Sequence, residues 1–150
     1  MLPWGWLGPH PGWGDPRQSR LTRDEQQTEF TLWAIARSPL ILGANLTKLD
    51  DFTKSLITNH TMLFMNQNVT YSHPVDTKSL GPSFENARVW RGTINAPGAG
   101  NYAEFFAFFN LGDQPVTLRT SWAQLGLEGK KHLAQNVWTE GGFKESKEVT

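Results

Sequence analysis

The pattern of apolar and polar positions changes along the chain, and its first part predicts helices around a buried strand. Residues 30–36 are apolar on nearly every side while residues 22–29 are polar, so we expect a helix that is buried at one end. Residues 40–42 form an apolar run without alternation, which is typical of a parallel strand covered on both faces. A second helix is expected over residues 49–58 and a short helical turn over residues 60–67. This order indicates a piece of an α/β array.

Capping signals give the first helix defined ends. Thr22 and Glu25 have the spacing of a capping box, in which each side chain accepts from the backbone N–H of the other residue. Pro39 disfavours helical geometry at the residue before it, so the helix is expected to end at about Arg37. The charge of Arg37 would then suit the last turn of the helix.

The pattern is different from residue 87 onward, where short β-branched and aromatic runs alternate with turn signals. Strands that follow helices without alternating with them indicate a separate antiparallel sheet or sandwich. Both faces of the second run are apolar, so we expect that strand to be central. Residues 121–127 resemble a helical turn, and residues 140–150 are polar and supply no closing apolar strand. The strands are expected at residues 88–94, 102–109, 116–120 and 133–139.

The remaining segments are a long loop at the start and a connection in the middle. Residues 1–21 have no periodicity and hold Trp4, Trp6 and Trp13. A loop of this length is usually functional or disordered, and its three tryptophans argue against disorder. The predicted domains are therefore residues 1–69 and 87–150, joined by a linker at residues 70–86.

Composition removes several classes of partner. The 150 residues carry 14 basic and 14 acidic side chains, so no basic surplus points to nucleic acid or an anionic membrane. No apolar run is long enough to span a bilayer, and the first residues lack the basic start and apolar core of a signal peptide. The chain has no Cys, which excludes disulfides and Cys nucleophiles, and its four His are scattered, so no metal or other cofactor is expected.

Several short motifs occur in an order that resembles a known family. The first part has Met1-Leu2, then Leu32-Trp33-Ala34-Ile35, Ser38-Pro39-Leu40-Ile41-Leu42-Gly43 and Asn66-Gln67. The second part has Arg88-Val89-Trp90, Phe109-Asn110-Leu111, Trp122 with Leu125-Gly126-Leu127, and Val137-Trp138-Thr139. This ordered set resembles the α-galactosidase (melibiase) family of glycoside hydrolases over almost the entire chain. One departure is Asn45, where many members have an Asp.

The resemblance implies a fold and an activity. It implies the C-terminal end of a (β/α)8 barrel over residues 1–69, from the end of the seventh strand to the eighth helix, followed by an antiparallel β-sandwich domain, both incomplete. Members cleave terminal α-galactosides with retention, and their nucleophile and acid/base are Asp residues that would precede Met1. We therefore expect no catalytic residue here and no activity of the chain alone. The family resemblance implies a secreted, periplasmic or lysosomal protein.

Three residues are candidates for substrate binding. The family Met at the position of Met1 lines the sugar pocket, although Met1 here is equally explained as the start of the chain. Trp4 and Trp6 belong to the following loop, where an indole can stack on the apolar face of galactose. A packing role under the long loop explains these two tryptophans equally well. The resemblance implies that the loops that discriminate between galactose, N-acetylgalactosamine and arabinose lie upstream of these residues.

Other interpretations of the chain stay open. The close acidic pairs Asp24-Glu25 and Asp50-Asp51 are both at expected helix starts, where capping explains them better than catalysis. The chain can instead be a non-catalytic carbohydrate-binding or interaction module, or the product of a broken gene. Unpaired strand edges of a partial barrel predict that the isolated chain forms homo-oligomers or aggregates. Asn-x-Thr acceptor motifs for glycosylation begin at Asn45, Asn59 and Asn68.

Overall fold

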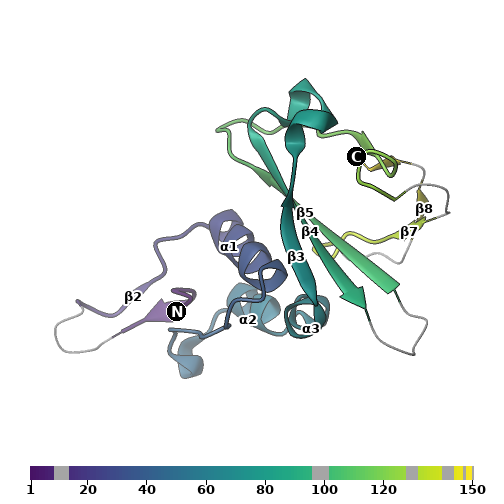
Figure 1. Cartoon of the computed structure of the whole chain (residues 1–150). Coiled ribbons are helices and arrows are strands. Elements are labelled where there is room, and N and C mark those ends of the chain that lie inside the picture. The colour runs from purple at the N-terminus through teal and green to yellow at the C-terminus, as the bar shows by residue number, and fades with distance from the viewer. Residues whose placement is uncertain (9–13, 96–101, 128–131, 140–143, 147, 150) are drawn as a thin grey trace. The chain divides into compact units, whose positions relative to one another are not determined.

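The computed structural model describes residues 1–8, 14–95, 102–127, 132–139, 144–146 and 148–149 (Figure 1). The chain divides into two compact units. The first unit comprises Met1–Ser72 and Gly92–Phe105, and the second comprises His73–Arg91 and Phe106–Thr150. No helix in the described part of the chain is long and apolar enough to cross a membrane.

The first unit contains the helices α1 (Arg23–Ile35), α2 (Asp51–Ile57) and α3 (His60–Asn68). Helix α1 lies against both α2 and α3 (Figure 1). The predicted capping box is confirmed: the Glu25 N–H donates to Thr22 Oγ1 at 3.2 Å, and the Thr22 N–H donates to Glu25 Oε2 at 2.7 Å. Asp50 caps α2 and Asn59 caps α3 in the same local way. The expected helices at 49–58 and 60–67 are therefore confirmed, with small differences at their ends.

Helix α1 ends earlier than expected. Its last residue is Ile35, and Arg37 has left-handed backbone geometry with φ 56°, so the prediction that Arg37 lies in the last turn is wrong. The Ser38 N–H donates to the Trp33 carbonyl at 2.9 Å, which closes the helix through a Schellman-type turn. Asn66 of α3 donates from Nδ2 to the carbonyls of Trp33 and Ser38 at 3.3 and 3.0 Å, so this turn is bound to α3.

The apolar run at residues 40–42 forms a single parallel bridge rather than a strand. Leu2 pairs with Leu42, the Leu2 N–H donates to the Ile41 carbonyl at 2.7 Å, and the Gly43 N–H donates to the Leu2 carbonyl at 2.9 Å. Ile41 is 59% exposed, so the expectation of a strand covered on both faces is wrong for this chain. The reason is that Leu2 is the one β-bridge partner described for this segment. A strand is covered on both faces only when strands lie beside it and helices pack above and below it.

The core of the first unit is formed by the helices and by the end of strand β4 (Ala87–Asn95) that reaches it. Gly92 brings the strand close to α1 and α3, because a Cβ at this position would be 3.1 Å from Ile35 Cγ1 and 3.2 Å from Val69 Cγ2. Buried side chains in this unit include Leu2, Trp4, Phe30, Ala34, Ile35, Leu56, Met62, Met65, Val69 and Ile94.

A three-stranded sheet has the order β3 (Tyr71–Val75), β4 (Ala87–Asn95) and β5 (Tyr102–Asn110). The expected strands at 88–94 and 102–109 are thus confirmed, but β4 and not β5 is central in the described sheet. Apolar side chains on both faces of β5 led to the wrong position, because they indicate that the faces are covered, whereas the place of a strand in a sheet depends on the strands that pair with its edges.

The last part of the chain pairs in short antiparallel ladders. β6 (Thr120–Ser121) pairs with β9 (Glu148–Val149), and β7 (His132–Ala134) pairs with β8 (Lys144–Ser146). The expected strands at 116–120 and 133–139 are therefore wrong in most of their length. Residues 140–150 were expected to supply no closing apolar strand, and the two strands described there, β8 and β9, are short and mostly polar. Such short strands were not foreseen, because they are held by their backbone ladders and need no apolar alternation.

The core of the second unit lies around Phe84. The buried cluster consists of Leu80, Phe84, Ala87, Val89 and Leu125, and the half-buried Val75, Phe106, Phe108, Leu118 and Trp122 pack against it. Residues 70–86, predicted as a linker, contain β3 and the 3₁₀ helices η2 (Thr77–Leu80) and η3 (Pro82–Phe84). This stretch therefore contributes directly to the packed core, while the domain boundaries given above stay a prediction.

Candidate functional site

Two loops leave the same edge of the parallel bridge between Leu2 and Leu42. One loop, described at residues 3–8 and 14–22, leads into α1, and the other covers residues 43–50 and leads into α2. In α/β folds, ligands bind where loops leave the carboxyl ends of parallel strands. The two loops are joined by a hydrogen bond from the Asn45 N–H to the Trp6 carbonyl at 2.8 Å. We call this edge with its two loops the loop edge.

Gly5 allows the loop edge to pack closely. It has φ 65°, and a Cβ on it would lie 3.1 Å from Thr53 Oγ1 and 3.4 Å from Leu49 Cδ2. A side chain at this position would therefore strain the backbone and push against Thr53 of α2 and against Leu49, two residues before that helix.

Met1 lies on the loop edge. Its side chain is 83% exposed, and its Cγ, Cε and Sδ atoms lie 3.0–3.1 Å from where a Cβ on Gly43 would be. The lack of a side chain at Gly43 is what gives Met1 room there. This position is open to a ligand, and the binding role of Met1 stays a prediction.

Trp4 lies in the core and not on the surface. It is 1% exposed, its ring centroid is 5.2 Å from that of Phe30, and its Nε1–H donates to Glu29 Oε2 at 2.8 Å. Stacking on a sugar needs an exposed indole face, which Trp4 does not present. The structure therefore agrees with the packing interpretation of this residue.

Trp6 is half-buried and its backbone is held from two sides. It belongs to β1 (Trp6–Leu7), which pairs antiparallel with β2 (Arg17–Gln18), and it accepts the hydrogen bond from Asn45. Lys48 Nζ lies 5.0 Å from the centroid of a Trp6 ring, within cation–π range. Trp6 is thus the tryptophan that the structure places on the loop edge with Met1, whereas Trp13 lies outside the described residues.

Asn45 and Lys48 belong to this site but were not predicted as binding residues. The 3₁₀ helix η1 (Leu46–Lys48) begins at Asn45, whose Oδ1 accepts from the Thr47 N–H at 3.0 Å and from Thr47 Oγ1 at 2.7 Å. This cap sets the turn that carries Lys48 toward Trp6. The signal available in the sequence was their position directly after the apolar run at residues 40–42.

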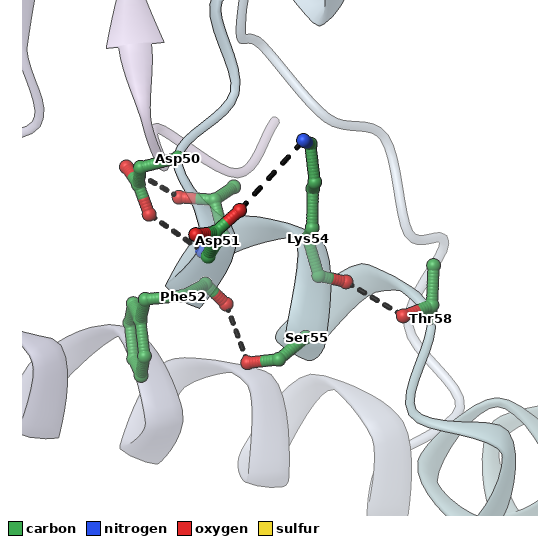
Figure 2. A network of polar contacts seen from close by, with 7 residues as sticks. Asp50, Asp51, Phe52, Lys54, Ser55 and Thr58 are labelled. Carbon is green, nitrogen blue, oxygen red and sulfur yellow. Dashed lines mark hydrogen bonds and ion pairs between the residues drawn. The ribbon is translucent and has the colours of Figure 1, made fainter.

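The acidic pairs have the capping roles that were predicted for them. Asp50 Oδ1 accepts from the Thr53 N–H at 2.8 Å and Asp50 Oδ2 accepts from Thr53 Oγ1 at 3.1 Å. Figure 2 shows Asp51 turned toward Lys54, with 3.8 Å between Oδ1 and Nζ on the exposed face of α2. Glu25 belongs to the capping box of α1. Each pair is accounted for by a helix terminus, and an exposed ion pair of this kind contributes about 0–1 kcal/mol.

Capping by Asp50 predicts a pH dependence of stability. The hydrogen bond from the Thr53 N–H lowers the pKa of Asp50 below its ordinary value, and burial opposes part of this shift. A lowered folded-state pKa gives stability that is complete above the ordinary pKa and is lost as the pH falls through the folded value. Asp50→Asn keeps an acceptor without a titrating group, so we expect a smaller loss of melting temperature between pH 5 and pH 2.5 than in the unchanged chain, measured by circular dichroism.

Two further variants separate this effect from loss of the cap. Asp50→Ala removes the cap and is expected to cost about 1 kcal/mol at neutral pH. Asp51→Asn is the matched control, because Asp51 makes only the exposed contact to Lys54. An acid-dependent change that is the same for Asp50→Asn and Asp51→Asn would contradict the assignment to Asp50.

Metal ligands do not gather in the part of the chain that the structure describes. No group of three or more His, Cys, Asp or Glu side chains is close enough there to hold a metal ion. The ring centroid of His132 lies 5.2 Å from that of Trp122 in the second unit, with the two rings tilted by 47°. His60 and His73 belong to α3 and β3. His10 lies outside the described residues.

Comparisons with known proteins relate the chain to one group of enzymes. The family model described as alpha galactosidase A matches residues 8–68. The α-galactosidase of Cyamopsis tetragonoloba is 27% identical over 133 residues, which are 85% of this chain and 30% of that protein. The α-galactosidase of Oryza sativa subsp. japonica is 25% identical over 138 residues, or 88% of this chain and 31% of that protein. The chain thus spans about a third of the length of these relatives.

Solved structures give the same relation over the whole chain. A β-L-arabinopyranosidase of glycoside hydrolase family 27 from Geobacillus stearothermophilus is 31% identical, with a TM-score of 0.79. The match covers 99% of this chain and 32% of that chain. A variant of the same enzyme in complex with arabinose matches with the same TM-score and identity.

Proposed function

Because the chain is related to the α-galactosidases of the melibiase family, we propose that it is the C-terminal portion of a retaining glycoside hydrolase that acts on terminal α-galactosides. The observation that carries the assignment to this part of a glycoside hydrolase is the match to the Geobacillus enzyme over 99% of the chain at a TM-score of 0.79. The choice of α-galactosides is supported by the α-galactosidases to which the chain is similar. The parallel bridge between Leu2 and Leu42, with α1 between them in the sequence, supports it as one βαβ step of a barrel.

In this proposal the first 69 residues are the last βα steps of the barrel. Leu2 ends the seventh strand, α1 is the seventh helix, residues 40–43 are the eighth strand, and α2 with α3 form the eighth helix. Residues 70–86 connect to a β domain at residues 87–150. The loop edge is then part of the mouth where barrel enzymes bind their substrates, with Met1 and Trp6 as the proposed sugar contacts.

The proposal also implies that the chain alone does not hydrolyse glycosides. Retention needs a nucleophilic carboxylate and an acid/base carboxylate about 5–5.5 Å apart. The acidic pairs at Asp24-Glu25 and Asp50-Asp51 serve helix starts, so the reacting carboxylates belong to the part of the family fold to which this chain does not correspond. Ile41 and Met1 are exposed at the bridge, and we further propose that the isolated chain self-associates through this edge.

A chimera tests the proposal directly. This chain replaces the corresponding third of the Geobacillus enzyme, and hydrolysis of nitrophenyl α-D-galactoside and β-L-arabinoside is measured beside the chain alone. The two sugars share their ring stereochemistry and differ in the hydroxymethyl group of galactose, so the pair also reports specificity. We expect activity in the chimera and none in the isolated chain. Hydrolysis by the isolated chain, or a folded chimera inactive on both substrates, would contradict the proposal.

The alternative of a carbohydrate-binding module without catalysis depends on exposed aromatic rings. Trp4 is buried, so within the described part of the first loop this alternative rests on Trp6. A folded, inactive chimera together with sugar binding by the isolated chain would favour the module.

A further inference from the structure

We propose that Lys48 and Trp6 form a subsite that favours a uronate, a sugar whose C6 is a carboxylate, over the corresponding neutral sugar. The inference rests on the proposed function, because that function makes the loop edge a sugar-binding surface. It goes further by assigning a charge preference to a named pair of residues.

The first observation is that the two residues meet although Lys48 follows Trp6 by 42 positions in the sequence. Lys48 Nζ lies 5.0 Å from the centroid of a Trp6 ring, and Lys48 is exposed while Trp6 is half-buried. An ammonium and an aromatic surface are therefore presented together at the loop edge.

The second observation concerns the charge of Lys48. Among the residues that the structure describes, no carboxylate forms an ion pair with Lys48, whereas Lys54 is paired with Asp51. The ammonium keeps its donors for a ligand, and the cation–π contact uses only one side of it.

The third observation is that the backbone of both residues is held in place before a ligand arrives. The Asn45 N–H donates to the Trp6 carbonyl at 2.8 Å, and the Asn45 side chain caps the turn that ends at Lys48. Trp6 is also paired with Gln18 in the β1–β2 ladder. A subsite that is already ordered pays less conformational entropy on binding than a mobile one.

The chemistry of these groups fits an acidic pyranose. An indole packs on the C–H face of a pyranose ring, and an ammonium donates charge-assisted hydrogen bonds to a carboxylate. Because Lys48 is exposed and screened by solvent, the preference is small. An exposed ion pair of about 0.2–1 kcal/mol corresponds to a preference of up to about fivefold in affinity.

The experiment compares two sugars on the 150-residue chain. Methyl α-D-galacturonate and methyl α-D-galactoside are titrated at low salt, and binding is followed by chemical shift changes of the Trp6 indole N–H. We expect galacturonate to bind about three- to fivefold more tightly. Lys48→Met keeps most of the apolar stem and is expected to abolish the preference, as is 0.5 M NaCl. Lys54→Met is the matched control and is expected to leave the preference intact.

Each outcome bears on the inference separately from the proposed function. Equal affinities for the two sugars, a preference that survives Lys48→Met, or no binding of either sugar at Trp6 would overturn the subsite. The activity of the chimera and the charge preference of the 150-residue chain are separate measurements. If the chimera is active and the chain shows no charge preference, the subsite is refuted and the proposed function is not. An inactive chimera with a Lys48-dependent preference refutes the hydrolase and leaves an anionic sugar-binding surface.

Discussion

Replacing Trp4 by alanine is expected to lower the free energy of unfolding by about 3–5 kcal/mol, as truncation of a large buried aromatic does. Trp4 is 1% exposed and packs on Phe30 of α1, so the change leaves a cavity between the first loop and that helix. It also removes the donor that binds Glu29 Oε2 at 2.8 Å. Urea unfolding of the chain, followed by far-ultraviolet circular dichroism, measures the loss.

Two variants identify the cause of this loss. Trp6→Ala changes the same residue type at a half-buried position and is expected to cost about 1 kcal/mol, a typical value for a point substitution. Trp4→Phe keeps most of the packing and removes the hydrogen bond to a carboxylate, which is worth about 1.5–3 kcal/mol. If Trp6→Ala were as destabilising as Trp4→Ala, the assignment of Trp4 to the core and Trp6 to the loop edge would be contradicted.

Trp4 and Trp6 lie in different environments, which explains why the sequence left both sugar stacking and packing open for them. In an extended strand, residues two apart point to the same side, and a shared role is the natural expectation. Gly5 has φ 65°, which breaks the extended geometry between them and sends Trp4 inward while Trp6 joins β1. Many glycines have ordinary dihedral angles, so the turn at Gly5 could not be read from its identity.

The features predicted correctly are those decided within a few residues. The cap at Thr22 and the cap at Asp50 each need one side chain and a backbone N–H three positions later, and both are present. The end of α1 was misplaced because the left-handed turn at Arg37 is held partly by Asn66, far along the chain. Propensity gives no warning of an Arg in this conformation.

Long-range pairing explains the remaining differences. The polar strand Lys144–Ser146 forms because β7 supplies a backbone ladder, which leaves no trace in the pattern of apolar residues. The apolar run at residues 40–42 indicates a buried strand, whereas the chain gives it one parallel partner at Leu2. Lys48 was not predicted as part of the candidate site, again because the contact is long-range. The hydrogen bond from the Asn45 N–H to the Trp6 carbonyl joins two loops that are far apart in the sequence.

Phe84 is expected to stabilise the core of the second unit as much as Trp4 stabilises the core of the first unit. It is 1% exposed, belongs to the cluster with Leu80, Val89 and Leu125, and its ring centroid lies 6.5 Å from that of Phe108. Phe84→Ala is therefore expected to cost about 3–5 kcal/mol. Hydrogen exchange read by mass spectrometry should show the largest loss of protection in residues 75–91 and 106–127, where the side chains that touch Phe84 lie.

Phe64→Ala is the matched control for this prediction, because Phe64 of α3 is 44% exposed and its truncation leaves no enclosed cavity. We expect it to change stability by about 0.5–1 kcal/mol, the lower part of the range for point substitutions. The same measurement tests whether residues 70–86 are a structureless linker or a packed segment. If they are a structureless linker, Phe84→Ala changes neither stability nor exchange, whereas a packed segment loses protection with the rest of the cluster. The burial of Leu80 and Phe84 on either side of Gly81 predicts the second result.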